Sequence, residues 1–302
     1  MSKPVPVSYI ESRQKRLSWL DDQTDLFRVI DGEGDGYPNV YVDQMGDIIL
    51  VSTMDEAVPQ NLLQEWQTMG CAVFHKTLEQ DVKRPPTQIL GPNIDSVFEA
   101  KEQGVKFKID LNAGYSQGIF LDQRLHRQKV RDLLKPGQTL LNTFAYTGAF
   151  SVYGALAGAQ TTTLDLAQPC LDWAKENMEL NGIDPKTQYF CKGDTLHWLN
   201  RFEKQGRQFD GIVLDPPTFS RDDKGNVFRV ERDYGKLVAL ASRCLAPKGW
   251  ILCTCNCKKL SHGAFKSMVR EGMPFASLSS DPMPPEFTGE DYLKRVWAVS
   301  RA

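Results

Sequence analysis

Short strand-like runs alternate with helix-like stretches from about residue 113 to the end of the sequence. The predicted strands cover residues 138–143, 160–165, 187–191, 210–214 and 249–255, with a last strand around Trp297. The predicted helices cover residues 121–134, 149–158, 168–181, 195–204, 229–245 and 264–271. This alternation is typical of a parallel sheet with crossover helices, so we predict an α/β, doubly wound, Rossmann-like fold.

The residues before this alternation follow a different pattern. Their predicted strands lie within residues 26–53, 71–76 and 97–110, and their predicted helices cover residues 1–20 and 58–69. The run D-G-E-G-D-G-Y-P at 31–38 has the glycine and proline content of a turn. We therefore predict a small strand-rich α+β domain over residues 1–110 and a second, catalytic domain over residues 111–302.

The composition is that of an ordinary globular protein. Of the 302 residues, 41% are hydrophobic and 25% are charged, and the formal net charge is −2. No overall basic field indicates a nucleic-acid partner, so such a partner would need a local basic patch. No apolar run approaches the roughly 20 residues that span a bilayer, and the first residues lack the apolar core of a secretion signal.

The sequence contains seven cysteines, an odd number, in strand-like and helix-like surroundings. This pattern favours reduced thiols and a cytoplasmic location. Three of the cysteines alternate in C-T-C-N-C at 253–257, and alternate residues of a strand share one face. Because no second cluster of Cys or His completes a tetrahedral set, we expect no metal site there.

Residues 140–166 form the unit around which the second domain is organised. An apolar strand leads into the turn A-Y-T-G at 145–148, a helix-like stretch follows, and a second strand ends at Asp165. In such units the loop backbone faces the charged part of a nucleoside-bearing cofactor, and the acid binds ribose hydroxyls. The loop contains neither G-x-G-x-x-G nor G-x-x-x-x-G-K-[ST], which weakens a dinucleotide interpretation and argues against a nucleoside triphosphate.

Polar residues follow four of the predicted strands. Asn142 belongs to the end of the first, and Asp165, Asp194 and Asp215 follow the next three. The carboxyl ends of parallel strands line one crevice, so we expect these side chains to lie along it. One such Asp alone is best interpreted as a helix N-cap. Three in succession favour ligand binding, because Asp is rarely buried unpaired.

The segment D-P-P-T-F at 215–219 predicts a rigid clamp for a planar base. Two prolines fix an extended turn and prevent a helix from starting directly behind the strand. Phe219 offers an aromatic face on which a flat ring can stack. The alternative interpretation is a plain turn, since Pro-Pro is common in loops.

These motifs together resemble class I S-adenosylmethionine-dependent methyltransferases. More closely, G-Y-S-Q-G-I-F-L-D-Q-R at 114–124 in front of N-T-F-A-Y-T-G is similar to the bacterial 23S ribosomal RNA methyltransferases of the RlmI and RlmK type. The D-G-E-G-D-G-Y-P run is similar to the start of the central domain of that family. The resemblance extends from about Phe27 to Trp297. It implies a Rossmann-like methyltransferase domain, S-adenosylmethionine as cofactor and RNA as partner.

The resemblance also implies roles for individual residues. The stretch that caps the cofactor site corresponds to Phe120, Asp122 and Arg124. The first cofactor loop corresponds to Asn142, Phe144, Tyr146, Thr147 and Gly148. The ribose-binding acid corresponds to Asp165, with Leu166 beside it. The residue near the adenine amino group corresponds to Asp194, with Thr195 and Leu196 beside it. The target-base motif corresponds to Asp215, Pro216 and Pro217.

The target base depends on T-C-N-C-K-K at 254–259, which matches both halves of the family in part. RlmI-like enzymes make 5-methylcytosine and have Ser-Cys-Ser there, whereas RlmK-like enzymes make 7-methylguanine and have Ser-Asn-Asn-Lys-Arg. Cytosine C5 requires a thiolate that adds to C6, for which Cys255 is the candidate and Cys257 a weaker one. Guanine N7 already has a lone pair and requires only alignment. The alternative for Cys253 and Cys255 is a role as small buried hydrophobic residues.

RNA contacts are expected from basic residues, and two other function classes stay open. RlmI-like enzymes carry an extra N-terminal PUA-type domain for which this sequence has no room, so we expect residues 1–110 to contact the RNA. The candidate basic residues are Lys83, Arg84, Lys101, Lys106, Lys108, Arg124, Arg127, Arg221, Lys224, Arg229, Arg232, Lys258 and Lys259. The alternatives are a non-catalytic RNA-binding protein on a methyltransferase scaffold and a methyltransferase for a small molecule or a protein glutamine.

Overall fold

The computed structural model describes residues 5–54, 57–78, 84–113, 116–221, 225 and 227–301. The chain divides into two compact units. The first unit comprises Met1–Arg124 and Met283–Asp291, and the second comprises Leu125–Pro282 and Tyr292–Ala302. The sequence predicts a boundary after residue 110. The structure instead assigns residues 111–124 and the late segment Met283–Asp291 to the first unit.

The first unit contains a mixed sheet in the order β1-β2-β3-β4-β5. Its strands are β1 (Leu26–Asp31), β2 (Val40–Met45), β3 (Ile48–Thr53), β4 (Ala72–Thr77) and β5 (Thr87–Leu90). Only β3 and β4 run parallel among these neighbours, because α2 (Gln60–Met69) connects them. A separate antiparallel ribbon consists of β6 (Val97–Glu102) and β7 (Val105–Asp110). Of these elements, β5 was not predicted from the sequence.

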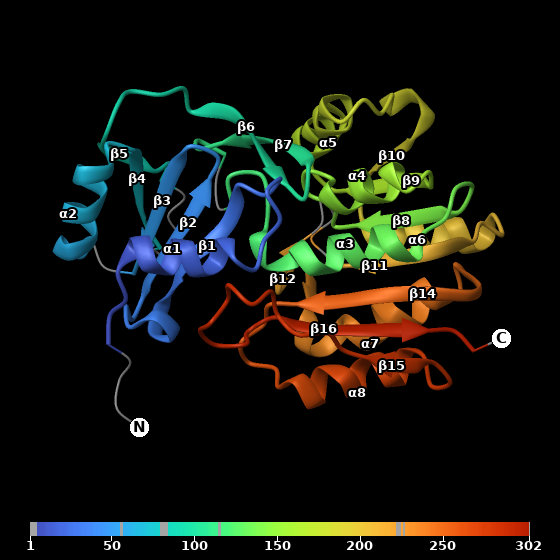
Figure 1. Ribbon diagram of the computed structural model, residues 1–302. Helices are drawn as coiled ribbons and strands as arrows, with labels where there is room; N and C mark the ends of the chain where they lie inside the picture. Colours follow the sequence, from blue (N-terminus) through green and yellow to red (C-terminus); the bar gives the residue numbers. More distant parts are fainter. Residues whose placement is uncertain are drawn as a thin grey trace. The chain divides into compact units, whose positions relative to one another are not determined.

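One face of the first sheet packs against α1 (Tyr9–Leu17) and α2, and α1 lies across β1 in Figure 1. Tyr9 and Trp66, one from each helix, meet edge to face with ring centroids 5.7 Å apart. They pack with Val29, Val42 and Val51 of the sheet. Apolar residues at alternate strand positions thus cover the face that packs against the helices.

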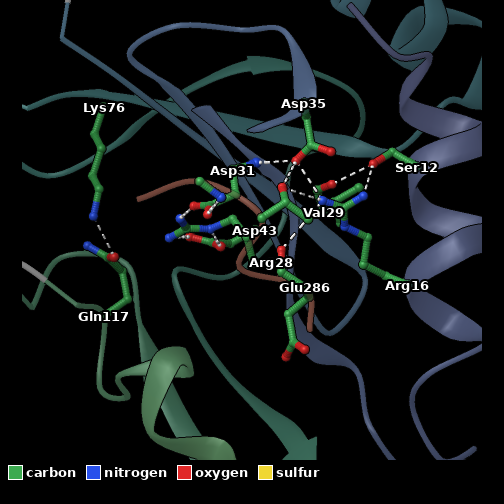
Figure 2. A network of polar contacts seen from close by, with 12 residues as sticks. Ser12, Arg16, Arg28, Val29, Asp31, Asp35, Asp43, Lys76, Gln117 and Glu286 are labelled. Atoms are coloured by element: carbon green, nitrogen blue, oxygen red, sulfur yellow. Dashed lines mark hydrogen bonds and ion pairs between the residues drawn. The ribbon is translucent and has the colours of Figure 1, made fainter. Parts of the chain in front are cut away.

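Charged residues of the first unit form a buried polar network, shown in Figure 2. The Arg28 guanidinium donates hydrogen bonds to Asp43 at 2.5 Å and to Asp31 at 2.6 Å. The Arg16 guanidinium donates to Asp35 at 2.6 Å, and both side chains are almost completely buried. Asp31 and Asp35 belong to the D-G-E-G-D-G-Y-P run, which forms the short 3-10 helix η1 (Gly32–Asp35).

The second unit contains a sheet in the order β10-β9-β8-β11-β14-β16-β15. The strands are β8 (Thr139–Thr143), β9 (Gln160–Asp165), β10 (Tyr189–Lys192), β11 (Phe209–Leu214), β14 (Leu245–Cys255), β15 (Ser277–Ser279) and β16 (Lys294–Val299). The strands from β10 to β14 are parallel, whereas β16 is antiparallel to both of its neighbours, β14 and β15. The chain order reverses between β8 and β11, which in such folds marks the binding crevice. The predicted doubly wound α/β fold is confirmed.

Helices cover both faces of this sheet. They are α3 (Arg124–Leu133), α4 (Ala149–Leu156), α5 (Gln168–Leu180), α6 (Thr195–Lys204), α7 (Val230–Ser242) and α8 (His262–Gly272). On β11, Ile212 and Leu214 pack toward α6, α7 and α8, while Val213 between them packs toward α3 and α4. Burial on both faces explains the continuous apolar run of β11, whereas β9 is buried in the same sheet with threonine at positions 161–163.

A short hairpin of β12 (Phe219–Arg221) and β13 (Val227–Arg229) follows the D-P-P-T segment. The sequence pattern did not predict it, nor β15, because strands this short are below the length at which periodicity can be recognised. None of the helices in the described residues has the length and apolar character of a membrane span.

Candidate functional site

The loop between β8 and α4 has an unusual backbone. Phe144 and Tyr146 have φ of 51° and 49°, and Gly148 has φ of 75°. Left-handed backbone is uncommon for aromatic residues and costs on the order of 1–3 kcal/mol at each position. Such strain persists where surrounding contacts impose it, and it clusters at functional sites. The loop lies at the carboxyl end of β8, where the chain order of the sheet reverses.

Asp165 at the end of β9 fixes this loop. Its Oδ2 accepts a hydrogen bond from the backbone N–H of Tyr146 at 2.8 Å, and its Oδ1 accepts one from Ala167 at 2.9 Å. Burial raises the pKa of Asp165, and the backbone hydrogen bonds oppose the rise only in part. A carboxylate has about four acceptor positions, so these backbone contacts, together with one from Leu166, do not use all of them. An ionised carboxylate at this strand end can accept a hydrogen bond from a ribose hydroxyl.

Other residues of the predicted loop have structural contacts. The Asn142 amide donates to Ser151 Oγ at 3.0 Å, and Thr163 also donates to that hydroxyl at 2.8 Å. Both bonds are buried and fasten α4 to β8 and β9. A Cβ atom at Gly148 would lie 2.6 Å from the Cβ of Ala174 in α5. The glycine is therefore explained by its positive φ and by close helix packing.

Asp194 is the N-cap of α6. Its Oδ1 accepts a hydrogen bond from the His197 N–H at 2.8 Å. The interpretation of a single Asp as a helix N-cap is therefore correct for Asp194. Thr195 is buried, and Leu196 packs partly against the core of the second unit. Leu166, beside Asp165, is 40% exposed and remains available as an apolar contact.

Asp215 at the end of β11 is held by the neighbouring strand. Thr254 Oγ1 of β14 donates a hydrogen bond to Asp215 Oδ1 at 2.5 Å. The buried Tyr234 hydroxyl bonds the carbonyl oxygens of Leu214 at 2.9 Å and of Thr254 at 3.1 Å, which ties the two strand ends together. Sequence reasoning missed Thr254 and Tyr234 in these roles, although Thr254 begins the T-C-N-C-K-K segment.

Residues 28–296 match the profile of the family described as S-adenosylmethionine-dependent methyltransferase. The chain belongs to this family. It is an enzyme that uses S-adenosylmethionine, as the resemblance implied. The strained loop and the Asp165 carboxylate have the chemistry that the nucleoside part of that cofactor requires.

Individual relatives of this methyltransferase agree with the family assignment. Ribosomal RNA large subunit methyltransferase K/L of Shewanella loihica is 36% identical over 97% of this chain and 43% of its own length. Ribosomal RNA large subunit methyltransferase I of an Enterobacter species is 30% identical over 83% of this chain and 66% of its own length. The chain therefore spans less than half of the K/L relative.

Among solved structures, the crystal structure of SMU.776, a candidate methyltransferase complexed with SAH (S-adenosylhomocysteine), has a TM-score of 0.86 and is 26% identical. The alignment covers 99% of this chain and 83% of that one. The similarity thus extends over both units of the methyltransferase.

The capping stretch predicted at residues 120–124 lies in the first unit. Phe120 is 41% exposed, whereas Asp122 is buried. The Arg124 guanidinium is also buried and donates to both carboxylate oxygens of Glu286, at 2.8 and 2.7 Å through Nη2. Glu286 comes from the late segment that joins the first unit. The prediction that Arg124 contacts RNA is wrong, because its side chain is buried in this ion pair.

Six of the other twelve predicted RNA contacts fall into three groups. Arg127 is 1% exposed, so its predicted contact with RNA is also wrong. Lys83 and Lys224 lie outside the described residues. The residues Arg229, Lys258 and Lys259 line a cavity of the second unit.

That cavity has a volume of about 460 Å³ and lies beside the D-P-P-T-F segment. Its lining residues are Thr218, Phe219, Arg229, Glu231, Asn256, Cys257, Lys258 and Lys259. The volume falls within the roughly 300–1,000 Å³ of small-ligand sites. The walls follow β11 and β14, which are neighbours in Figure 1. Phe219 is 48% exposed, as a stacking surface requires. Pro216 is buried and Pro217 exposed.

The cysteines of the T-C-N-C-K-K segment are buried. Cys255 is 0% exposed, and burial raises the pKa of its thiol to about 12. Burial likewise raises the pKa of Cys253 to about 12. Cys257 is 2% exposed, and its thiol donates a hydrogen bond to Glu231 Oε1 at 3.5 Å. A reactive thiolate needs a lowered pKa and access to its substrate. The geometry of Cys253 and Cys255 favours their role as small buried hydrophobic residues.

Proposed function

We propose that this methyltransferase transfers a methyl group from S-adenosylmethionine to N7 of a guanine in RNA, with large-subunit ribosomal RNA as the substrate. Relatives that cover most of the chain are named ribosomal RNA large subunit methyltransferases K/L and I, which supports ribosomal RNA. The motifs at 114–124 and 215–220 support the same substrate class. The choice of guanine rests on the buried Cys255.

The cofactor is proposed to bind at the carboxyl ends of β8, β9 and β10. Asp165 would accept hydrogen bonds from the ribose hydroxyls, through the acceptor positions that its backbone contacts leave open. Asp194 and Leu196, at the start of α6, would contact the adenine. The rest of this cofactor site would be lined by Phe144, Tyr146 and the backbone between them. When bound, S-adenosylmethionine supplies an electrophilic methyl group on its sulfonium sulfur.

We propose that Asn142, Thr147 and Gly148 support the loop of the cofactor site through contacts with α4 and α5. Asn142 is tied to Ser151, and the Thr147 carbonyl accepts a hydrogen bond from the buried Asn177 amide at 2.9 Å. Gly148 permits the close approach of α5. These contacts hold the loop rigid, which keeps its backbone groups oriented before the cofactor binds.

The target base is proposed to enter the cavity beside D-P-P-T-F. Asp215 and the backbone that follows it would border the base on the side of β11. The hydrogen bond from Thr254 holds the Asp215 carboxylate in one orientation. Phe219 would stack on the base after the nucleotide has flipped out of the RNA, as enzymes that modify bases require.

The burial of Cys255 is the observation that favours guanine over cytosine. Methylation of cytosine C5 needs a thiolate that adds to C6. With a pKa of about 12, the Cys255 thiol is almost entirely protonated at neutral pH, and its sulfur is not exposed to a substrate. Methylation of N7 uses the lone pair of the base and needs only clamping and alignment.

The first unit is proposed to contact the RNA backbone. The ribbon of β6 and β7 carries Lys101, Lys106 and Lys108, and the exposed Arg84 precedes β5. Such side chains bind phosphates and position an RNA without reading its sequence. A ribosomal RNA substrate agrees with the cytoplasmic location that the reduced cysteines favour.

Mass spectrometry of ribosomal RNA nucleosides from a strain that lacks the gene tests this function. We expect one 7-methylguanine to disappear and to return when the wild-type gene is restored, but not when Asp215→Ala is supplied. Loss of a 5-methylcytosine instead would refute the choice of base. If no RNA nucleoside changes, a small molecule or a protein is the substrate. Calorimetric binding of S-adenosylhomocysteine to the purified chain would argue against a non-catalytic scaffold.

A further inference from the structure

The wall of the cavity beside D-P-P-T-F consists of three chain segments, and hydrogen bonds link all three. The Val230 N–H at the start of α7 donates to the Thr218 carbonyl at 3.1 Å. Thr218 Oγ1 donates to Asn256 Oδ1 after β14, also at 3.1 Å. The Cys257 thiol closes the ring with its bond to Glu231. Glu231 and Asn256 are therefore held on the same cavity wall.

Asn256 presents donors to this cavity. Its side-chain oxygen already accepts the hydrogen bond from Thr218. An Asn amide has two further N–H donors on nitrogen. Within the described part of the chain these N–H groups have no acceptor, so they can donate to a ligand.

Glu231 presents acceptors. The Cys257 thiol is a weak donor and occupies one carboxylate oxygen at 3.5 Å. Three cationic side chains line the same cavity, but Glu231 forms no ion pair within the residues that the structure describes. A carboxylate left without a salt bridge among cations keeps its other acceptor positions open.

The bases differ in the edge that they present to such a wall. The Watson–Crick edge of guanine has the acceptor O6 next to two donors, N1–H and the 2-amino group. Cytosine presents one donor, its 4-amino group, next to the acceptors N3 and O2. A carboxylate accepts hydrogen bonds and cannot donate them, so it matches the guanine donors and repels the acceptors of cytosine.

We infer that Glu231 and Asn256 select guanine in this cavity, with Glu231 accepting from N1–H and the 2-amino group and Asn256 donating to O6. This inference rests on the proposed function and names the residues that determine its base. Contacts to the Watson–Crick edge leave N7, on the opposite edge, without a hydrogen bond and open to methylation. The Arg229 guanidinium lies 5.1 Å from the centroid of Phe219, which adds a planar cation to the stacking surface.

The test combines one protein change with one base change. The methylated nucleotide is first mapped by mass spectrometry, and two 23S transcripts are assembled with guanine or hypoxanthine at that position. Hypoxanthine lacks only the 2-amino group. The wild-type chain is expected to methylate the hypoxanthine transcript with a kcat/KM about ten- to a hundredfold lower, because a hydrogen bond to Glu231 is lost.

Glu231→Gln should lower methylation of the guanine transcript by a similar factor. It should also remove the preference for guanine over hypoxanthine. We expect its kcat/KM to be about ten- to a hundredfold lower, with guanine and hypoxanthine within about twofold of each other. Glu179→Gln, on the exposed face of α5, should behave like the wild type. Calorimetry should give an unchanged Kd for S-adenosylhomocysteine in both variants.

Two results would overturn the inference. The first is a Glu231→Gln enzyme that methylates the guanine transcript at the wild-type rate. The second is a variant that still discriminates against hypoxanthine as strongly as the wild type. Either result with 7-methylguanine as product leaves the proposed function intact. A product of 5-methylcytosine would instead remove the proposed base together with this inference.

Discussion

Arg124 and Glu286 form a buried bidentate ion pair although 162 residues separate them in sequence. Arg124 ends the capping stretch and is the first residue of α3, and Glu286 lies in the segment Met283–Asp291 that belongs to the first unit. The backbone of the same segment packs tightly against η1, since a Cβ atom at Gly34 would lie 2.3 Å from the Thr288 carbonyl oxygen. Arg16 donates to the Glu286 carbonyl at 3.4 Å, as Figure 2 shows.

This pair makes the late segment an integral part of the first unit, which leads to a stability prediction. Glu286→Gln leaves the buried Arg124 charge without its counter-ion. We expect the free energy of unfolding to fall by about 3 kcal/mol, the usual cost of breaking a buried pair. Urea denaturation followed by circular dichroism measures the change.

The control for this substitution lies in the same unit. Glu99→Gln removes the exposed pair of Glu99 with Lys106, whose closest atoms are 3.8 Å apart. Its effect should stay below about 1 kcal/mol, because exposed pairs contribute little. Equal losses of stability in the two variants would show that the Arg124–Glu286 pair stabilises the fold no more than an exposed pair does.

The hydrogen bond between Thr254 and Asp215 leads to a kinetic prediction. Thr254→Val keeps the shape of the side chain but removes the hydroxyl that orients the carboxylate. If Asp215 borders the target base, kcat should fall at least about tenfold, since small misplacements of reacting groups are costly. The Kd for S-adenosylhomocysteine should not change. A normal kcat in Thr254→Val would mean that the orientation of Asp215 does not matter for methyl transfer.

The raised pKa of Asp165 predicts that cofactor affinity depends on pH. The ribose contact needs the ionised carboxylate as acceptor, and burial makes that form harder to reach than in an exposed Asp. Affinity should therefore be complete well above the raised pKa and decline as the pH falls through it. Titration calorimetry with S-adenosylhomocysteine from about pH 8 to about pH 4.5 follows this change.

Two variants control the pH experiment. Asp165→Asn should bind more weakly at neutral pH and lose the pH dependence that the carboxylate causes. Asp172→Asn, whose carboxylate is paired with Lys175 at 2.8 Å on the surface, should retain the wild-type profile. An unchanged profile in Asp165→Asn would assign the pH dependence to another group.

The local chemistry of the sheet could be predicted from the sequence, because strand ends and turns are determined by neighbouring residues. The run that ends at Asp165 is rich in β-branched threonine, which favours a strand, and its acid comes at the strand end. Contacts between distant segments could not be predicted in this way. Thr254 reaches Asp215 only because β14 pairs with β11, and no periodicity reveals that register. Glu286 lies in a stretch without any regular pattern, so its ion pair depends entirely on the tertiary fold.

The roles of single residues were harder to predict than their positions. Gly148 matched a cofactor loop in the sequence, yet its lack of a side chain is explained by the contact with Ala174. The charge of Arg124 favoured a nucleic-acid contact, but its ion pair buries it. In both cases burial decided the role, and burial depends on which elements pack together.

Cys255 decides between the two chemistries, and its substitution gives the most direct prediction. Cys255→Ala removes a buried thiol with a pKa of about 12 that a non-covalent transfer to N7 does not need. We expect kcat within about threefold of the wild type at unchanged cofactor affinity, together with a loss of stability of about 1 kcal/mol from the small cavity. Between about pH 7 and pH 9 the wild-type rate should not rise tenfold per unit, as it would if a thiolate with so high a pKa were the nucleophile. Cys170→Ala, a half-buried cysteine at the start of α5, controls for general effects of losing a thiol. Complete loss of methyl transfer in a folded Cys255→Ala enzyme would restore the covalent mechanism and cytosine as the target.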